Sequence, residues 1–369
     1  MNLKFITVLK EAIRVFLWTY FVLYLNVIGF SVIEIGCILA IGNFVYFIGY
    51  LLSGPLTDRL SASLALKLSL FVFFVSLLGM QFENFVIISL AFSLFNFAQS
   101  IGDVAIPILI ESTKTRSSRV EFAVFSGLVS IGDAIILSLA LFSLLFLSIV
   151  ELFRYTLILF GIMLLIMSRF VPRINFVGKP SKLTFNVFKE FSFESRAYLI
   201  LATFQIAAVI FYWGYMALYA KMTGMSEILW TLSVILWFVV NALIYFIVVK
   251  LGLKVSYLPI YCILEVLLCA LTLLKSPILL ILAFALDAVA TALFWPLHFE
   301  FVMANVKEEL RGTYLGLLYA FRSVLMTVVY YVAALIYEIN PAFNIILAGI
   351  IYAVFTIFVY PIFRKTLHE

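Results

Sequence analysis

The stretch Gly54-Pro55-Leu56-Thr57-Asp58-Arg59-Leu60 is a short polar break between two long apolar segments, residues 33–53 and 64–80. Each segment approaches the about 20 apolar residues that a helix needs to cross the roughly 30 Å hydrocarbon core of a bilayer. Backbone groups in lipid must be satisfied within the segment, so both segments are predicted to be helices. The break is then a connection at the membrane surface.

The same alternation of apolar segments and short polar breaks runs through all 369 residues, of which 66% are hydrophobic and 12% charged. This composition lies far outside the range of soluble domains. We therefore predict an all-α polytopic membrane protein with twelve transmembrane helices. The predicted spans are 10–28, 33–53, 64–80, 85–108, 120–146, 151–171, 197–220, 227–249, 256–275, 278–303, 313–337 and 342–362.

The basic residues predict the orientation of the chain, because cytoplasmic connections retain Lys and Arg. Twenty of the 24 Lys and Arg fall in alternate gaps and flanks if the N-terminus is cytoplasmic. We expect both termini in the cytoplasm and the protein in the cell (plasma) membrane. The net charge of +5 is then a topology signal, spread over separate loops, and does not indicate nucleic-acid binding. The three cysteines lie inside spans without metal-ligand spacing, so we expect no metal and no cofactor.

One longer connection divides the chain into two halves of similar length. Residues 172–196 contain Pro172, Pro180 and several basic residues between two blocks of six predicted spans. We predict an N-terminal six-helix bundle (1–171), a cytoplasmic linker (172–196) and a C-terminal six-helix bundle (197–369). Equal halves suggest a parallel internal repeat, an arrangement common in secondary transporters.

The break at residues 54–60 resembles the loop signature of the major facilitator superfamily, Gly-x-Leu-Ala-Asp-Arg-x-Gly-Arg-Arg/Lys. Gly54, Leu56, Asp58 and Arg59 match it in register, whereas residues 61–63 (Ser-Ala-Ser) stand where Gly and two basic residues are usual. The resemblance also includes Tyr24-Leu25, Gly29-Phe30-Ser31, Glu34-Ile35-Gly36 and Arg311-Gly312. It implies a pseudo-symmetric fold of two six-helix bundles that transports solutes by alternating access.

The resemblance also implies a conformational latch formed by Gly54, Asp58 and Arg59. Asp58 would lie against the positive N-terminal end of the eleventh predicted helix, near Gly312, where a helix dipole favours a carboxylate. Arg59 would pair with an acidic residue of the next loop, Glu111 or Glu121. The alternative is a tight turn with solvated charges.

Ionisable residues at membrane depth cost roughly 2.5–3.5 kcal/mol each on insertion scales unless they are paired or wetted, so we take them as functional candidates. Asp287, Asp133 and Asp103 are the candidates for proton coupling, because desolvation favours the neutral carboxyl and lets it take up and release protons. The alternative is a static ion pair with Arg322 or Arg14. Glu265 is also at membrane depth, but it falls on a helix that the resemblance assigns to the scaffold, so it is not among these candidates.

Polar and aromatic residues recur at helical spacing on several predicted spans, as expected of a central cavity. Each stripe alone favours interhelical hydrogen bonding over a cavity, whereas the six stripes together favour a cavity. The candidate substrate-binding residues are Asn43, Tyr46, Asn96, Gln99, Gln205, Tyr212, Tyr219, Trp237, Asn241, Thr291, His298 and Arg322.

These residues favour a proton-coupled transporter, acting as a monomer in the bilayer, that exports an amphipathic or cationic small molecule through apolar and cation–π contacts. Uptake of a polar solute such as a sugar is the alternative, because sugars also stack on aromatic rings. A non-transporting sensor or lipid-moving protein on the same scaffold is another. Intramembrane enzymes need Asp-rich pairs, His-Glu-x-x-His or a Gly-x-Ser elbow, and the spans contain none of these, so we expect no enzyme.

Overall fold

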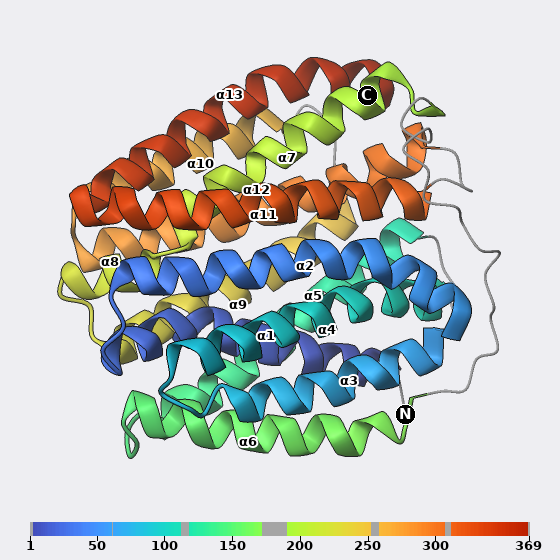
Figure 1. Cartoon of the computed structure of the whole chain (residues 1–369). Coiled ribbons are helices and arrows are strands. Elements are labelled where there is room, and N and C mark those ends of the chain that lie inside the picture. The colour runs from blue at the N-terminus through green and yellow to red at the C-terminus, as the bar shows by residue number, and fades with distance from the viewer. Residues whose placement is uncertain are drawn as a thin grey trace. The chain divides into compact units, whose positions relative to one another are not determined.

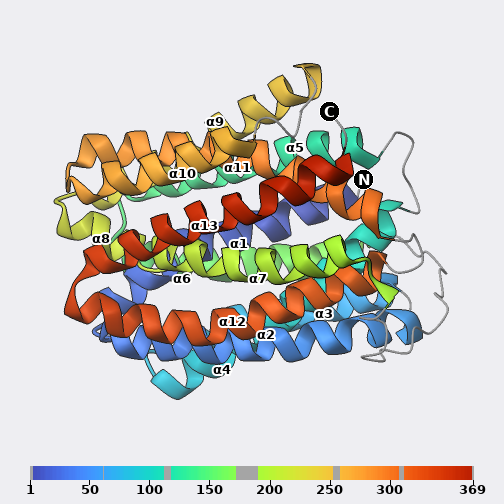
Figure 2. The ribbon, with the colours of Figure 1, turned by 90° about the horizontal axis from the view of Figure 1, so that it is seen from above.

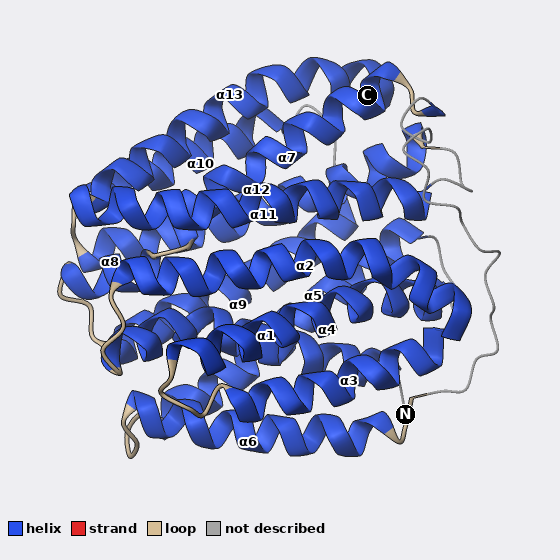
Figure 3. Ribbon diagram, viewed as in Figure 1, coloured by secondary structure: helices blue, strands red, loops and turns tan. Residues whose placement is uncertain are grey.

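The computed structural model describes residues 3–60, 62–111, 118–171, 190–251, 258–306 and 311–367. Thirteen α-helices and no strand occupy these ranges (Figures 1 and 3). Their bounds are α1 Leu3–Val27, α2 Val32–Leu60, α3 Ala62–Gly79, α4 Phe85–Glu111, α5 Ser118–Ser143, α6 Ile149–Ser168, α7 Phe193–Trp213, α8 Met216–Met222, α9 Glu227–Leu251, α10 Leu258–Leu273, α11 Pro277–Asn305, α12 Arg311–Ile339 and α13 Pro341–Leu367.

These helices correspond to the twelve predicted spans and confirm the predicted all-α membrane fold. The predicted span 197–220 is divided into α7 and α8, since Gly214 and Tyr215 interrupt it. Nine segments within the described ranges are long and apolar enough to cross a membrane, and α3 and α10 are shorter apolar helices. The remaining helix, α1, has Lys10, Glu11 and Arg14 in its first half.

The predicted second span, 33–53, agrees with the apolar part of α2, Val32–Ser53, but the helix itself continues to Leu60. A helix satisfies its own backbone hydrogen bonds at the membrane surface as it does in lipid, and Pro55 removes only one of them. Gly54, Asp58 and Arg59 therefore lie in the last two turns of α2. Their side chains are outside the described part of the structure, so the latch stays a prediction. Residues 172–189 of the predicted linker are also outside the described ranges.

The chain forms two compact units that do not follow chain order. Unit 1 comprises residues 1–115, 146–184 and 315–334, and thus α1–α4, α6 and most of α12. Unit 2 comprises residues 116–145, 185–314 and 335–369, and thus α5, α7–α11 and α13. The predicted boundaries at residues 171 and 197 stay a prediction.

In unit 1, α4 packs against both α2 and α3, and α6 lies beside α3 (Figure 1). Glycines let α2 approach α4 closely. A Cβ atom at Gly42 would lie 2.3 Å from the Phe92 ring, and one at Gly49 would lie 2.1 Å from the Ser100 Oγ. Small residues at such contacts drive helix association in lipid, where the hydrophobic effect between helices is absent.

In unit 2, α5 packs against α9, α7 against α13, and α11 against both α9 and α10, which lie beside it in Figure 2. Aromatic rings fill the interior: Tyr261 stacks on Phe294 at 4.9 Å between ring centroids, and Trp213 stacks on Phe284 at the same distance. Large apolar side chains such as Leu139 and Ile357 remain exposed, at 60% and 68%. Lipid is the solvent that suits them.

Candidate functional site

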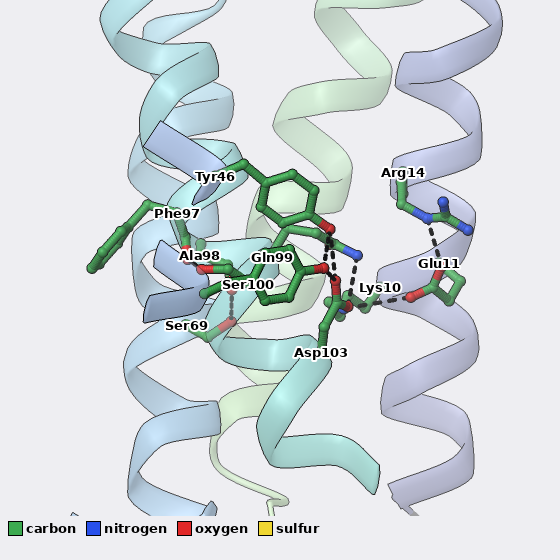
Figure 4. Close-up of polar contacts among 11 residues, drawn as sticks. Lys10, Glu11, Arg14, Tyr46, Ser69, Phe97, Ala98, Gln99, Ser100 and Asp103 are labelled. Atoms are coloured by element: carbon green, nitrogen blue, oxygen red, sulfur yellow. Dashed lines mark hydrogen bonds and ion pairs between the residues drawn. The ribbon is translucent and has the colours of Figure 1, made fainter. Parts of the chain in front are cut away.

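Asp103 on α4 is the centre of a polar cluster in unit 1 (Figure 4). Its Oδ1 accepts hydrogen bonds from the Lys10 Nζ at 2.6 Å and the Gln99 Nε2 at 3.0 Å. Its Oδ2 accepts the hydroxyl groups of Tyr46 at 2.7 Å and Tyr50 at 2.8 Å. Gln99 lies one helical turn before Asp103, and the two tyrosines lie one turn apart on α2. Three predicted site residues, Tyr46, Gln99 and Asp103, therefore meet here.

Lys10 is the charged residue of this cluster that the sequence analysis did not select as a candidate, because it was counted among the charges that set topology. Its side chain is 1% exposed and forms an ion pair with Asp103. Gly102 makes room for it, since a Cβ atom there would lie 2.8 Å from the Lys10 Cε. In the sequence, Gly102 directly precedes Asp103. This glycine was the sign that another side chain packs closely against α4 beside the acid.

Arg14 does not take the role of counter-charge to Asp103 that its depth suggested. Its Nε donates to the Glu11 Oε2 at 2.6 Å, and its side chain is 53% exposed. Figure 4 shows the Arg14 side chain directed to Glu11 on the same helix. Asp103 thus forms an ion pair, and its partner is Lys10 and not Arg14.

Asp287 on α11 has a different environment in unit 2. It is 3% exposed, and its Oδ2 accepts a hydrogen bond at 2.5 Å from the indole Nε1 of Trp237 on α9. The indole of Trp213 on α7 lies near the same carboxyl group. Among the described residues of unit 2, no basic side chain forms an ion pair with Asp287. Two predicted site residues, Trp237 and Asp287, are therefore in contact.

Most other candidate residues form hydrogen bonds within their own unit. Asn43 bonds the backbone of its own helix, whereas the others link neighbouring helices. The interhelical bonds are Gln205 Nε2 to Tyr261 OH (3.0 Å), Tyr212 OH with Thr272 Oγ1 (2.9 Å), Tyr219 OH to the Thr272 carbonyl (3.1 Å), Asn241 Nδ2 to the Ala288 carbonyl (3.0 Å), Ser130 Oγ to Asn241 Oδ1 (3.1 Å), and Tyr198 OH with His298 Nδ1.

The remaining candidates are placed as follows. Asp133 on α5 and Arg322 on α12 are 2% and 6% exposed, and Thr291 on α11 is partly exposed. Asn96 on α4 is 7% exposed, and its Nδ2 has no hydrogen-bond partner among the described residues. Gln99 uses its Nε2 on Asp103, but its Oε1 has no partner there either. Hence α4 presents one free donor and one free acceptor, one turn apart. The described residues contain no group of three or more metal-ligating side chains.

The comparisons with known proteins agree with this arrangement of helices. The sequence pattern of the MFS_1 like family matches residues 12–329. The chain belongs to this family. It is thus a transporter of the major facilitator superfamily (MFS), as the motif at residues 54–60 indicated. No curated protein matches the chain by sequence.

Solved structures of MFS transporters share the fold over almost the whole chain. The D-xylose-proton symporter has a TM-score of 0.77 at 14% identity, and the matched region covers 97% of this chain and 95% of the symporter chain. A mutant of the nucleoside transporter NupG has a TM-score of 0.72 at 17% identity, covering 98% of each chain. The human organic anion transporter MFSD10 has a TM-score of 0.72 at 14% identity, covering 97% and 98%. At these identities the likeness concerns the fold alone.

Proposed function

We propose that this MFS transporter is a proton antiporter that exports amphipathic or cationic small molecules across the plasma membrane, with Asp287 as the group that exchanges a proton for the solute. The observation that carries the proposal is the environment of Asp287. Its carboxyl group is buried, accepts the indole N–H of Trp237, lies near the indole of Trp213, and has no basic partner among the described residues of its unit.

Competition for one carboxyl group gives the direction of transport. A buried carboxylate without a counter-cation is costly, so it must be neutralised by a proton or by a bound cation. If the two alternate at Asp287, each outward movement of solute requires an inward movement of protons. An inward proton gradient then drives export of the cation.

Aromatic side chains beside Asp287 suit an amphipathic cation. Trp213 and Trp237 are partly exposed, so part of each ring is available to a ligand. An indole face attracts an organic cation by about 0.5–2 kcal/mol, more when the contact is desolvated. The acid supplies charge and the rings supply apolar area, and neither excludes molecules of varied shape.

Asp103 and Asp133 support the assignment by contrast. The Lys10 ammonium and three neutral donors satisfy Asp103, so its charge needs neither a proton nor a solute. Asp133 is buried in α5 of the same unit as Asp287 and stays a second candidate for proton coupling.

Transport in proteoliposomes tests the proposal. The protein is reconstituted with an acidic lumen, the membrane potential is clamped at zero with potassium and valinomycin, and tetraphenylphosphonium accumulation is measured against protein-free liposomes. Accumulation that follows the pH gradient is expected for the wild type and for Glu338→Gln, a matched change at an exposed carboxyl group. Asp287→Asn should abolish it. Wild-type accumulation by Asp287→Asn would refute the proposal.

Uptake of a polar solute is the second candidate, and α4 supplies the observation that favours it. The free Asn96 Nδ2 and Gln99 Oε1 are a donor and an acceptor of the kind that bind hydroxyl groups. In the same liposomes, proton flux on addition of D-xylose or uridine, lost in Asn96→Ala, would support this candidate in place of the first. Absence of any solute counterflow would point to a sensor or lipid-moving protein. We propose that the chain acts as a monomer with cytoplasmic termini and has no enzymatic activity.

A further inference from the structure

Glu265 is a third buried acid in unit 2, after Asp287 and Asp133, and lies in the middle of α10. Its side chain is 2% exposed, and its Oε2 has no hydrogen-bond partner among the described residues. No Lys, Arg or His of the described part of unit 2 forms an ion pair with it. An uncompensated buried carboxylate costs several kcal/mol, so this site requires a proton on Glu265 for much of the time.

No described residue of the helices around α10 forms an ion pair with Glu265. α10 packs against α11 and α13. Among the described residues, the titratable groups near Glu265 are neutral or acidic. They are Tyr261, Cys262 and Cys269 on α10, Tyr212 on α7, Asp287 on α11 and Tyr352 on α13.

Of these groups, Asp287 is the one that also carries a carboxyl. Charge on one acid opposes charge on the other, and the interaction is strong where the dielectric constant is low. Two acids that interact in this way titrate as a pair. A structural role for Glu265 alone would not explain why its free oxygen lies where no protein donor reaches it.

We propose that Glu265 is a second proton-binding residue of this transporter, coupled by charge to Asp287. The pair holds two protons in one stage of the cycle and one in another, and it is never fully ionised. This inference rests on the proposed function, since it extends the proton site at Asp287 from one residue to two. The sequence pattern of the family gave no reason to choose it, because Glu265 falls on a scaffold helix.

Infrared difference spectroscopy of the purified protein in lipid tests the coupling without any solute. The carbonyl band of protonated carboxylic acids is followed as pH is raised, and wild type is compared with Glu265→Gln, Asp287→Asn and the control Glu338→Gln. Each of the first two variants should lack one band that titrates in the wild type, and the control should lack neither.

Reciprocity is the sharper expectation. In Glu265→Gln the neighbour of Asp287 no longer becomes negative, so the Asp287 band should disappear at a pH lower by about one unit or more. Asp287→Asn should shift the Glu265 band in the same direction. If Glu265→Gln does not fold, Glu265→Asp retains a carboxyl with a displaced band, and Asp287→Asn alone still reports the shift.

Two results would overturn the inference: a Glu265 band that persists at every pH, or a remaining band in each single variant that titrates at the same pH as in the wild type. Neither result contradicts antiport at Asp287, which the proteoliposome transport assay measures separately. Conversely, coupled bands together with wild-type accumulation by Asp287→Asn would leave the proton pair in place and refute the proposed function.

Discussion

The buried ion pair between Lys10 and Asp103 gives the most quantitative prediction. Lys10 is 1% exposed, and without Asp103 it keeps only the Glu11 carboxylate, at 3.4 Å. Asp103 is 22% exposed and without Lys10 keeps the hydrogen bonds from Gln99, Tyr46 and Tyr50. Replacing Asp103 and replacing Lys10 should therefore lower the free energy of unfolding by different amounts.

Removing one partner of a buried pair costs about 3–5 kcal/mol. We expect Asp103→Asn to lose this amount, because the Lys10 ammonium stays buried. Lys10→Met should lose about 2–3 kcal/mol, since three neutral donors still satisfy Asp103. The double variant should cost less than Asp103→Asn alone, with a coupling energy near the upper end of about 0.5–3 kcal/mol.

Equilibrium unfolding of the four proteins in mixed detergent–SDS micelles measures these free energies of unfolding. Arg14→Met is the matched control, because it breaks an exposed ion pair on the same helix and should cost about 0–1 kcal/mol. Additive single variants, or a larger loss for Lys10→Met than for Asp103→Asn, would refute the reasoning.

Three further changes have defined outcomes. Gly102→Ala should mimic Lys10→Met with a loss of about 1–3 kcal/mol in the same unfolding assay, because its Cβ would displace the Lys10 Cε. Ser148→Ala removes the capping box of α6 and should cost about 1 kcal/mol by unfolding, whereas Ser148→Asp should retain most of the stability. Trp237→Phe removes an indole donor that favours charged Asp287, so half-maximal cation transport should move to higher pH, and an unchanged pH profile would show that the hydrogen bond has no such role.

The sequence predicted the helices well because hydrophobic length is a direct physical requirement of the bilayer. It did not predict that α2 continues past its apolar span to Leu60, since composition marks where lipid ends and not where a helix ends. It also placed Trp237 and Asp287 among the candidates, and the structure joins them by a hydrogen bond.

The sequence analysis considered Arg14, and not Lys10, as a partner of the intramembrane acids, and spacing alone could not have decided between the two. The two residues are one turn apart on α1, so their spacing puts both near the same depth. A small rotation of α1 decides which side chain reaches α4, and the packing of the whole unit sets that rotation. The same limit applies to Glu265, whose isolation depends on α11 and α13.

The glycine contacts between α2 and α4 have a consequence for sequence variation. Gly42 and Gly49 are seven residues apart, so they lie on one face of α2, at two positions where Phe92 and Ser100 leave no room for a Cβ atom, whereas Phe44 and Leu52 are about half exposed, at 50% and 49%. Saturation mutagenesis of α2 should therefore give a profile with a period of two helical turns. Positions 42 and 49 should reject every substitution larger than hydrogen, while the exposed positions between and beyond them exchange freely among apolar residues.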